Sequence, residues 1–244
     1  MGDVHLPRIS ELAVSSVTVL TVAQLGSQVA CTATSAAYAV TLPAAASCTG
    51  LSYTLRMLPT NTKLVTLTGN ASELIDGVNT RIMWAGEAAT IFCDGTGWHK
   101  TAGKTIPMTC LMSQVASVGQ SIATGAFRLV TLDTSNTDNT GLMASTGSHY
   151  INVVRGGNYL VSITLSISGS IATSSYNGAY GTSGSATAGI LYYVTPGTGG
   201  VTIGNTVNYS IATNGTVGLW YNASAASAIT SATPYLSVTE IPIW

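Results

Sequence analysis

The stretch Leu51-Ser52-Tyr53-Thr54-Leu55-Arg56-Met57-Leu58 decides the fold class, because apolar and polar side chains alternate along it as far as Met57. Alternation with a period of two places one set of side chains inward and the other outward on a β-strand. Pro59 follows directly, and proline has no N–H group to donate to a strand ladder. The stretch therefore predicts a half-buried strand that ends before Pro59.

Similar short runs, separated by Gly, Asn, Ser and Thr turns, recur along almost the whole chain. They predict strands at residues 17–22, 38–42, 63–67, 81–84, 90–93, 127–132, 150–154, 159–167, 190–194, 201–203, 206–211, 217–221 and 235–241. The strand at 90–93 is followed by a predicted turn, Asp94-Gly95-Thr96-Gly97. Helical patterns occur only around Leu12 and over 109–117, and both lack good caps. The sequence predicts an all-β fold. No segment repeats with a period of about 20–50 residues, which argues against solenoids and propellers.

Charged residues are unusually scarce. Lys, Arg, Asp and Glu make up 7% of the 244 residues, with eight basic and nine acidic side chains, whereas an ordinary soluble domain has about 25%. No face can carry the dense basic stripe that nucleic acids require. No run reaches the ~18 apolar residues of a membrane-spanning helix, and the N-terminus lacks the basic and apolar regions of a signal peptide.

The shortage of charge also predicts self-association. Exposed strand edges without charged gatekeepers pair with other chains and aggregate. Burial of these edges and faces between identical subunits around a symmetry axis prevents this. We therefore expect an assembly component.

Composition changes near Gly103. Lys104 is the last lysine of the chain, and nine of the eleven tyrosines follow it. We expect an N-terminal attachment segment at 1–28, a β-module at 29–103, a linker at 104–115 and a larger β-domain at 116–244.

The first half resembles a known β-module. Its motifs are Val40-Thr41-Leu42-Pro43-Ala44-Ala45, Asn61 to Leu67, Glu73-Leu74-Ile75-Asp76-Gly77 and Asp94-Gly95-Thr96-Gly97-Trp98-His99. This ordered series resembles a small module common in bacteriophage tail-fibre and appendage proteins. It departs from that module at Cys93, where serine is usual, and at Ala88-Ala89, which are less polar than usual.

The second half resembles another family. Gly147-Ser148-His149-Tyr150-Ile151, Gly156-Gly157-Asn158-Tyr159-Leu160-Val161 and Tyr235 to Ile241 are similar to the core motifs of C1q/TNF-like trimeric jelly rolls. Tyr150 replaces the usual Phe, and Gly156 stands where Pro-Gly is expected. The resemblance implies a jelly-roll β-sandwich whose subunits form a homotrimer around a threefold axis.

Together these features predict a bacteriophage virion structural protein, a short trimeric fibre or spike whose N-terminal segment binds other virion proteins. The outward β-sandwich would bind a bacterial surface glycan or protein. One alternative is a capsid decoration or head-fibre protein bound to the shell through its N-terminus. A secreted lectin and a capsule depolymerase are less favoured.

The candidate receptor contacts are Tyr176, Asn177 and Tyr180 in the Gly/Ser-rich stretch 168–189. Tyrosine supplies flat contact area and a hydroxyl at low entropic cost. The alternative interpretation is a loosely ordered loop without a binding role.

We expect no enzymatic activity, cofactor or metal. The chain has no G-x-S-x-G, P-loop, H-E-x-x-H or G-x-G-x-x-G motif. Asp133, Asn136, Asp138 and Asn139 form the densest oxygen cluster of the second half, and we interpret them as Asx-turn residues in preference to Ca²⁺ ligands. His99 is expected at a strand end on the surface and His149 in a strand.

The four cysteines, Cys31, Cys48, Cys93 and Cys110, all lie in the first half. Buried free thiols are expected for a chain of this kind, and the alternative is one or two disulfides, with Cys48 and Cys93 as the first pair to test.

Overall fold

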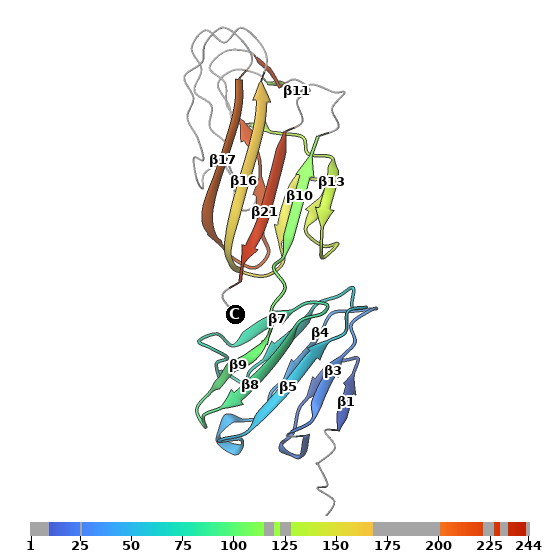
Figure 1. Ribbon diagram of the computed structural model, residues 1–244, viewed down its shortest axis with the longest axis vertical. Coiled ribbons are helices and arrows are strands. Elements are labelled where there is room, and N and C mark those ends of the chain that lie inside the picture. Colours follow the sequence, from blue (N-terminus) through green and yellow to red (C-terminus); the bar gives the residue numbers. More distant parts are fainter. Residues whose placement is uncertain are drawn as a thin grey trace, which may run out of the picture. The chain divides into compact units, whose positions relative to one another are not determined.

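The computed structural model describes residues 10–24, 26–114, 120–122, 128–167, 201–221, 227–229 and 234–242. The chain divides into two compact units, the first ending at Ile106 (unit 1) and the second beginning at Pro107 (unit 2). The all-β prediction is confirmed, because the described residues form strands and two 3-10 turns, η1 (Val22–Gln24) and η2 (Ala45–Ser47) (Figure 1). None of the helices described is long and apolar enough to cross a membrane.

Unit 1 contains two sheets. Sheet A has the order β1 (Glu11–Val14), β3 (Gln28–Cys31), β5 (Ser52–Met57), β8 (Ala88–Cys93) and β9 (Trp98–Lys104). Sheet B has the order β2 (Thr18–Val19), β4 (Tyr38–Thr41), β6 (Val65–Thr68) and β7 (Thr80–Met83). The predicted strand 51–58 is therefore β5, in the middle of sheet A.

The chain alternates between the two sheets of unit 1. β1, β3 and β5 pair in parallel in sheet A, and β2, β4 and β6 pair in parallel in sheet B. The first six strands thus coil between the two sheets, whereas β7, β8 and β9 pair antiparallel with their neighbours. The turns of the coil differ in length, since Glu11 pairs with Gln28, 17 positions later, and Gln28 pairs with Thr54, 26 positions later. Unequal turns leave no fixed period in the sequence.

Both sheets of unit 1 share one core. The inward side chains of alternate positions form a single buried cluster that includes Val14, Leu20, Val29, Val40, Tyr53, Leu55, Val65, Leu67, Ile91 and Trp98. The rings of Tyr53 and Trp98 lie 5.8 Å apart between centroids, and the Tyr53 hydroxyl donates to the Thr21 carbonyl at 2.6 Å. The alternating pattern thus becomes a packed interior, with the tyrosine hydroxyl satisfied.

The predicted strand 17–22 is shorter than expected. Only Thr18–Val19 pairs, and Val22–Gln24 forms η1. The backbone N–H of Thr21 donates to Gln24 Oε1 at 2.8 Å. A local side-chain hydrogen bond therefore replaces the strand ladder at this point.

Unit 2 is built around an antiparallel five-stranded sheet, sheet C. Its order is β13 (Thr134–Asp138), β10 (Thr109–Ser113), β21 (Tyr235–Ile241), β16 (Gly157–Ile167) and β17 (Val201–Ile211) (Figure 1). A three-stranded sheet follows the order β14 (Ala144–Ser145), β15 (Tyr150–Val153) and β18 (Gly215–Gly218). Two ribbons pair β11 (Gln120–Ile122) with β20 (Ser227–Ile229) and β12 (Arg128–Leu129) with β19 (Trp220–Tyr221).

Several strand predictions in unit 2 need adjustment. The expected strands 201–203 and 206–211 form one strand, β17, because its ladder with β16 continues through Gly204. Of the described part of the expected strand 127–132, residues 128–132, only Arg128–Leu129 is a strand. The expected strand 190–194 lies outside the described residues. Residues 109–113, where we considered a helix, form β10.

The expected segment boundaries can be placed against these elements. β1 and β2, inside the range 1–28, are the first strands of sheets A and B. β10 lies inside the range 104–115 and occupies an interior position of sheet C.

A buried ion pair connects β21 of unit 2 with the bend between β15 and β16. Arg155 Nε donates to Glu240 Oε1 at 2.7 Å, and the Arg155 Nη2 atom donates to Glu240 Oε2 at 2.5 Å. The same Oε2 atom accepts a hydrogen bond from the Met108 backbone N–H at 3.0 Å, and the Tyr159 hydroxyl donates to the Arg155 carbonyl. Glu240 therefore connects β21 to the first residues of unit 2 through the Met108 hydrogen bond, and to the segment before β16 through the Arg155 ion pair.

Candidate functional site

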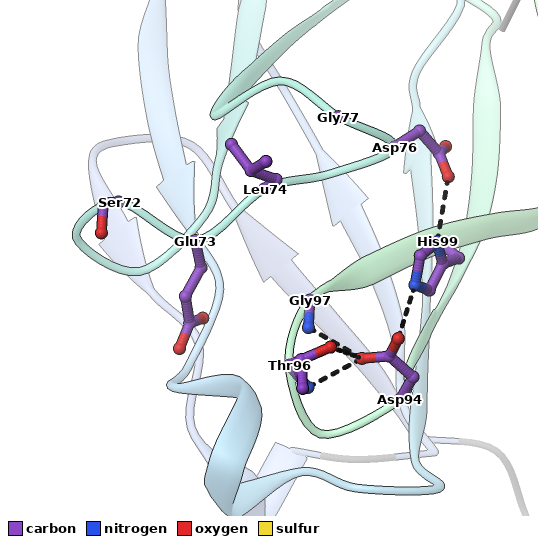
Figure 2. A pocket seen from close by; sticks show the side chains of 9 residues that line it. All are labelled: Ser72, Glu73, Leu74, Asp76, Gly77, Asp94, Thr96, Gly97 and His99. Atoms are coloured by element: carbon purple, nitrogen blue, oxygen red, sulfur yellow. Dashed lines mark hydrogen bonds and ion pairs between the residues drawn. The ribbon is translucent and has the colours of Figure 1, made fainter.

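A pocket of about 390 Å³ opens in unit 1 beside the turn between β8 and β9 (Figure 2). The segment from Ser72 to Gly77 forms one wall, and the turn with the first residues of β9 forms the other. The pocket is lined by Ser72, Glu73, Leu74, Asp76, Gly77, Asp94, Thr96, Gly97 and His99. Its charged groups determine what it can bind or catalyse.

Asp94 organises the β8–β9 turn. Its Oδ1 atom accepts hydrogen bonds from the Thr96 and Gly97 backbone N–H groups at 2.7 and 2.8 Å, and from the Thr96 hydroxyl at 2.8 Å. Gly95 has φ +96°, a left-handed conformation that favours glycine. These donors stabilise the ionised carboxylate and hold the pKa of Asp94 well below its usual range. The turn predicted from Asp94-Gly95-Thr96-Gly97 is confirmed.

His99 connects the two walls of the pocket. Its Nε2 atom lies 3.0 Å from Asp94 Oδ2, and its Nδ1 atom lies 3.4 Å from Asp76 Oδ1 (Figure 2). The hydrogen bond to Asp94 and the charges of both carboxylates raise the pKa of His99. Because both ring nitrogens face a carboxylate, the protonated ring is favoured. His99 lies at the surface near the start of β9, as expected.

The carboxylates of this pocket are engaged with the protein itself. Asp76 Oδ2 accepts the Lys100 backbone N–H at 3.1 Å. The two Glu73 oxygens accept the Ala45 backbone N–H at 2.9 and 3.0 Å. Arg81 Nη2 donates to the Asp76 carbonyl at 2.8 Å. The cluster therefore acts as an electrostatic clamp on the segment 72–77. Its carboxylates accept hydrogen bonds from the backbone or face the His99 ring.

The oxygen cluster of unit 2 also makes local contacts. Asp138 Oδ1 accepts the backbone N–H groups of Thr140 and Gly141, and its Oδ2 accepts those of Met143 and Ala144. These bonds hold the pKa of Asp138 below its usual value although burial opposes them. Asp138 thus closes an Asx-type turn, in agreement with the interpretation of this cluster from the sequence as Asx-turn residues. Among the described residues, no three His, Cys, Asp or Glu side chains are grouped to hold a metal.

The other members of that cluster point to different partners. Asn136 Oδ1 accepts the Ser113 hydroxyl at 2.8 Å. Asn139 accepts the Thr109 backbone N–H at 2.9 Å and donates to the Pro107 carbonyl at 2.7 Å. Asp133 Oδ1 accepts the Thr134 hydroxyl at 3.1 Å. Asn139 therefore bonds to the backbone, whereas Asn136 and Asp133 accept from hydroxyl side chains.

His149 is not in a strand, contrary to the expectation. It precedes β15 in a turn, with φ +62°, and its Nδ1 atom lies 3.0 Å from the Leu132 carbonyl oxygen. Its left-handed backbone conformation keeps His149 out of the strand, and the alternating pattern begins only at Tyr150.

All four cysteines are buried free thiols, as expected. Burial raises the pKa of Cys31 to about 11 and that of Cys110 to about 12. Tyr176, Asn177 and Tyr180, the candidate receptor contacts, lie outside the described residues.

The outward face of sheet C carries no ionic side chain among its described residues. Strand register places its residues in three rows, and Ser113 among them is buried: Thr109, Thr239, Leu160 and Asn208; Leu111, Ser237, Ser162 and Thr206; Ser113, Tyr235, Thr164 and Gly204. Leu160 and Tyr235 are 41% and 37% exposed. The sequence analysis did not predict this face, although polar side chains occupy alternate positions along much of 159–167 and 235–241.

A scan against protein-family models finds no model that matches this chain, and a search of curated proteins finds no matching relative.

Proposed function

We propose that this chain is a virion structural protein, the subunit of a short homotrimeric fibre or spike of a bacteriophage. The observation that carries the proposal is the uncharged outward face of sheet C. The motif resemblance supplies the viral assignment, and the physical chemistry of that face supports the assembly.

A symmetric contact requires a face that is compatible with itself. Near a symmetry axis, a residue of one copy meets the same residue of another, so identical charges repel. A hydroxyl both donates and accepts and can therefore pair with an identical hydroxyl. The three rows of sheet C consist of hydroxyl, amide and apolar side chains, with Leu160 and Tyr235 as apolar anchors. This composition favours contact between identical copies.

The size of the face also fits. Five strands about 4.8 Å apart and about seven residues of about 3.4 Å each give a surface of roughly 600 Å². Stable interfaces bury about 800 Å² on each partner. The sheet C face therefore supplies most of the area that one subunit needs.

Within the trimer, unit 2 is a jelly-roll β-sandwich that faces outward and binds the host surface through 168–189, including Tyr176, Asn177 and Tyr180. The antiparallel pairing of sheet C and of β14, β15 and β18 supports this fold. The N-terminal residues attach the subunit to other virion proteins.

The assembly is tested by sedimentation equilibrium of the full chain over a range of concentrations. A mass three times that of the 24.9 kDa chain is expected. A chain that sediments as a monomer throughout would refute the proposal.

The location and role are tested on particles. Immunogold labelling of the tail tip, together with adsorption of the purified protein to host cells, is the expected result. Label spread over the capsid instead would support the decoration or head-fibre alternative. Absence of label from the particle would refute a virion role.

A further inference from the structure

The outward face of sheet B in unit 1 is uncharged, in contrast to the outward face of sheet A. Register places its side chains in two rows, with Ala39, Thr66 and Ile82 in one row and Val19, Thr41, Thr68 and Thr80 in the other. Every residue of these rows is uncharged, and all except Ala39 are β-branched. The inward positions, including Val40, Val65, Leu67 and Met83, are buried in the core.

Sheet A provides a comparison within the same unit. Its outward positions include Glu11, Arg56, His99 and Lys104. Arg56 and Glu11 form an exposed ion pair at 3.0 Å. The two sheets share one core and one solvent, yet the ionic side chains occupy only one of the two outward faces. Burial requirements of the core do not explain this difference, because both faces point away from it.

Two exposed apolar side chains lie at the edge of the uncharged sheet. Val17 and Val19, on and beside edge strand β2, are 72% and 59% exposed. Val19 pairs with Thr41 and lies on the same side of the sheet. A β-branched face next to an unpaired strand edge is prone to association unless a partner covers it.

We propose that the outward face of sheet B is a contact between copies of this chain, in which it packs against the same face of neighbouring subunits. This inference rests on the proposed homo-oligomer and adds unit 1 to its interface. The partner is a second copy because threonine rows are self-complementary: each hydroxyl donates and accepts, and no like charges meet across the contact.

The face is too small to act alone. Four strands about 4.8 Å apart and about four residues of about 3.3 Å each give roughly 250 Å², well below the ~800 Å² that a stable partner contributes. The contact therefore strengthens an assembly that other surfaces hold together. Its loss raises the concentration at which the oligomer dissociates and leaves the fold unchanged.

The test compares two matched substitutions in the full chain. Thr66→Lys places a charge in the middle of the sheet B face. Thr54→Lys places the same charge in the middle of the sheet A face, at another half-buried threonine of an interior strand. We expect Thr66→Lys to raise the concentration at which the oligomer dissociates at least tenfold, while Thr54→Lys leaves it within about twofold.

Val19→Ser provides a second variant in case Thr66→Lys disturbs folding, because Val19 is largely exposed and outside the core. It is expected to raise the dissociation concentration severalfold, with an unchanged circular dichroism spectrum. If folded Thr66→Lys and Val19→Ser both dissociate as the unsubstituted chain does, the inference is wrong and the proposed assembly stands. If the unsubstituted chain is a monomer, the proposed assembly itself fails.

Discussion

Arg155 and Glu240 lie 85 positions apart in the chain and form a buried two-pronged ion pair, with Nε–Oε1 and Nη2–Oε2 distances of 2.7 and 2.5 Å. The side chains are only 10% and 7% exposed. Because the Met108 backbone N–H also donates to Glu240, removal of the carboxylate charge leaves a buried guanidinium and weakens the hold on the start of unit 2.

Glu240→Gln is therefore expected to destabilise unit 2. Breaking a buried ion pair costs about 3–5 kcal/mol. Glu11→Gln is the control, since the Glu11–Arg56 pair is 53% and 41% exposed and exposed pairs contribute less than about 1 kcal/mol. Urea unfolding followed by tryptophan fluorescence measures both free energies of unfolding. Equal effects of the two substitutions would contradict the structural role of Glu240.

The clamp around His99 predicts a pH dependence of unit 1. The pKa of His99 is raised from 6.5, so its contribution to stability is fully present below pH 6.5 and is lost as the pH rises through the folded value. The pKa of Asp94 is lowered from 3.8, so its contribution is present above pH 3.8 and is lost as the pH falls.

His99→Gln should therefore lower the unfolding temperature of unit 1 more at pH 5 than at pH 9. Calorimetry of both proteins at the two pH values measures this difference. NMR titration of the His99 ring gives an independent reading, with a pKa above 6.5 expected. An equal loss at both pH values would show that the protonated ring does not hold Asp76 and Asp94 together.

The four thiols predict a simple reactivity pattern. Cys31, Cys48, Cys93 and Cys110 are buried, and burial raises the pKa of each. A thiol reagent at pH 8 should therefore leave the folded chain almost unlabelled, because the thiolate is the reactive form. In denaturant without reductant, four equivalents should react. Two equivalents would instead indicate a disulfide.

Gly103 in β9 predicts a backbone effect. It has φ +136°, and a Cβ atom there would overlap the Ala88 carbonyl oxygen. The ladder of β8 with β9 shifts register nearby, between Thr90 and Ile91. Gly103→Ala should thus destabilise unit 1 by about 1–3 kcal/mol. Gly147→Ala, at a position with ordinary φ and nothing within 4 Å, should change stability by less than about 0.5 kcal/mol. Thermal unfolding of both variants gives the comparison.

The sequence predicts individual strands better than their arrangement. Alternation identified β5, and it identified most of β16 and β21, because each has one buried and one outward face. It did not predict the parallel pairing of β1 with β3, since Glu11 and Gln28 are matched by the path of the chain and not by a local pattern. It also overestimated β2, where the Gln24 side chain captures the Thr21 N–H.

The candidate sites show the same limit. The turn at Asp94 was predicted because an Asx turn is local. The approach of Asp76 to His99 was not, because 23 positions separate them and a loop brings them together. The uncharged faces of sheets B and C are visible only once the register shows which alternate positions line up side by side.

The uncharged outward face of sheet B has one more consequence. Dissolved salt weakens contacts by screening charges over about 8–10 Å at physiological strength, and this face offers no charges to screen. Excluded ions such as sulfate strengthen the burial of such surfaces. The contribution of this face to an assembly would therefore not weaken as the salt concentration rises.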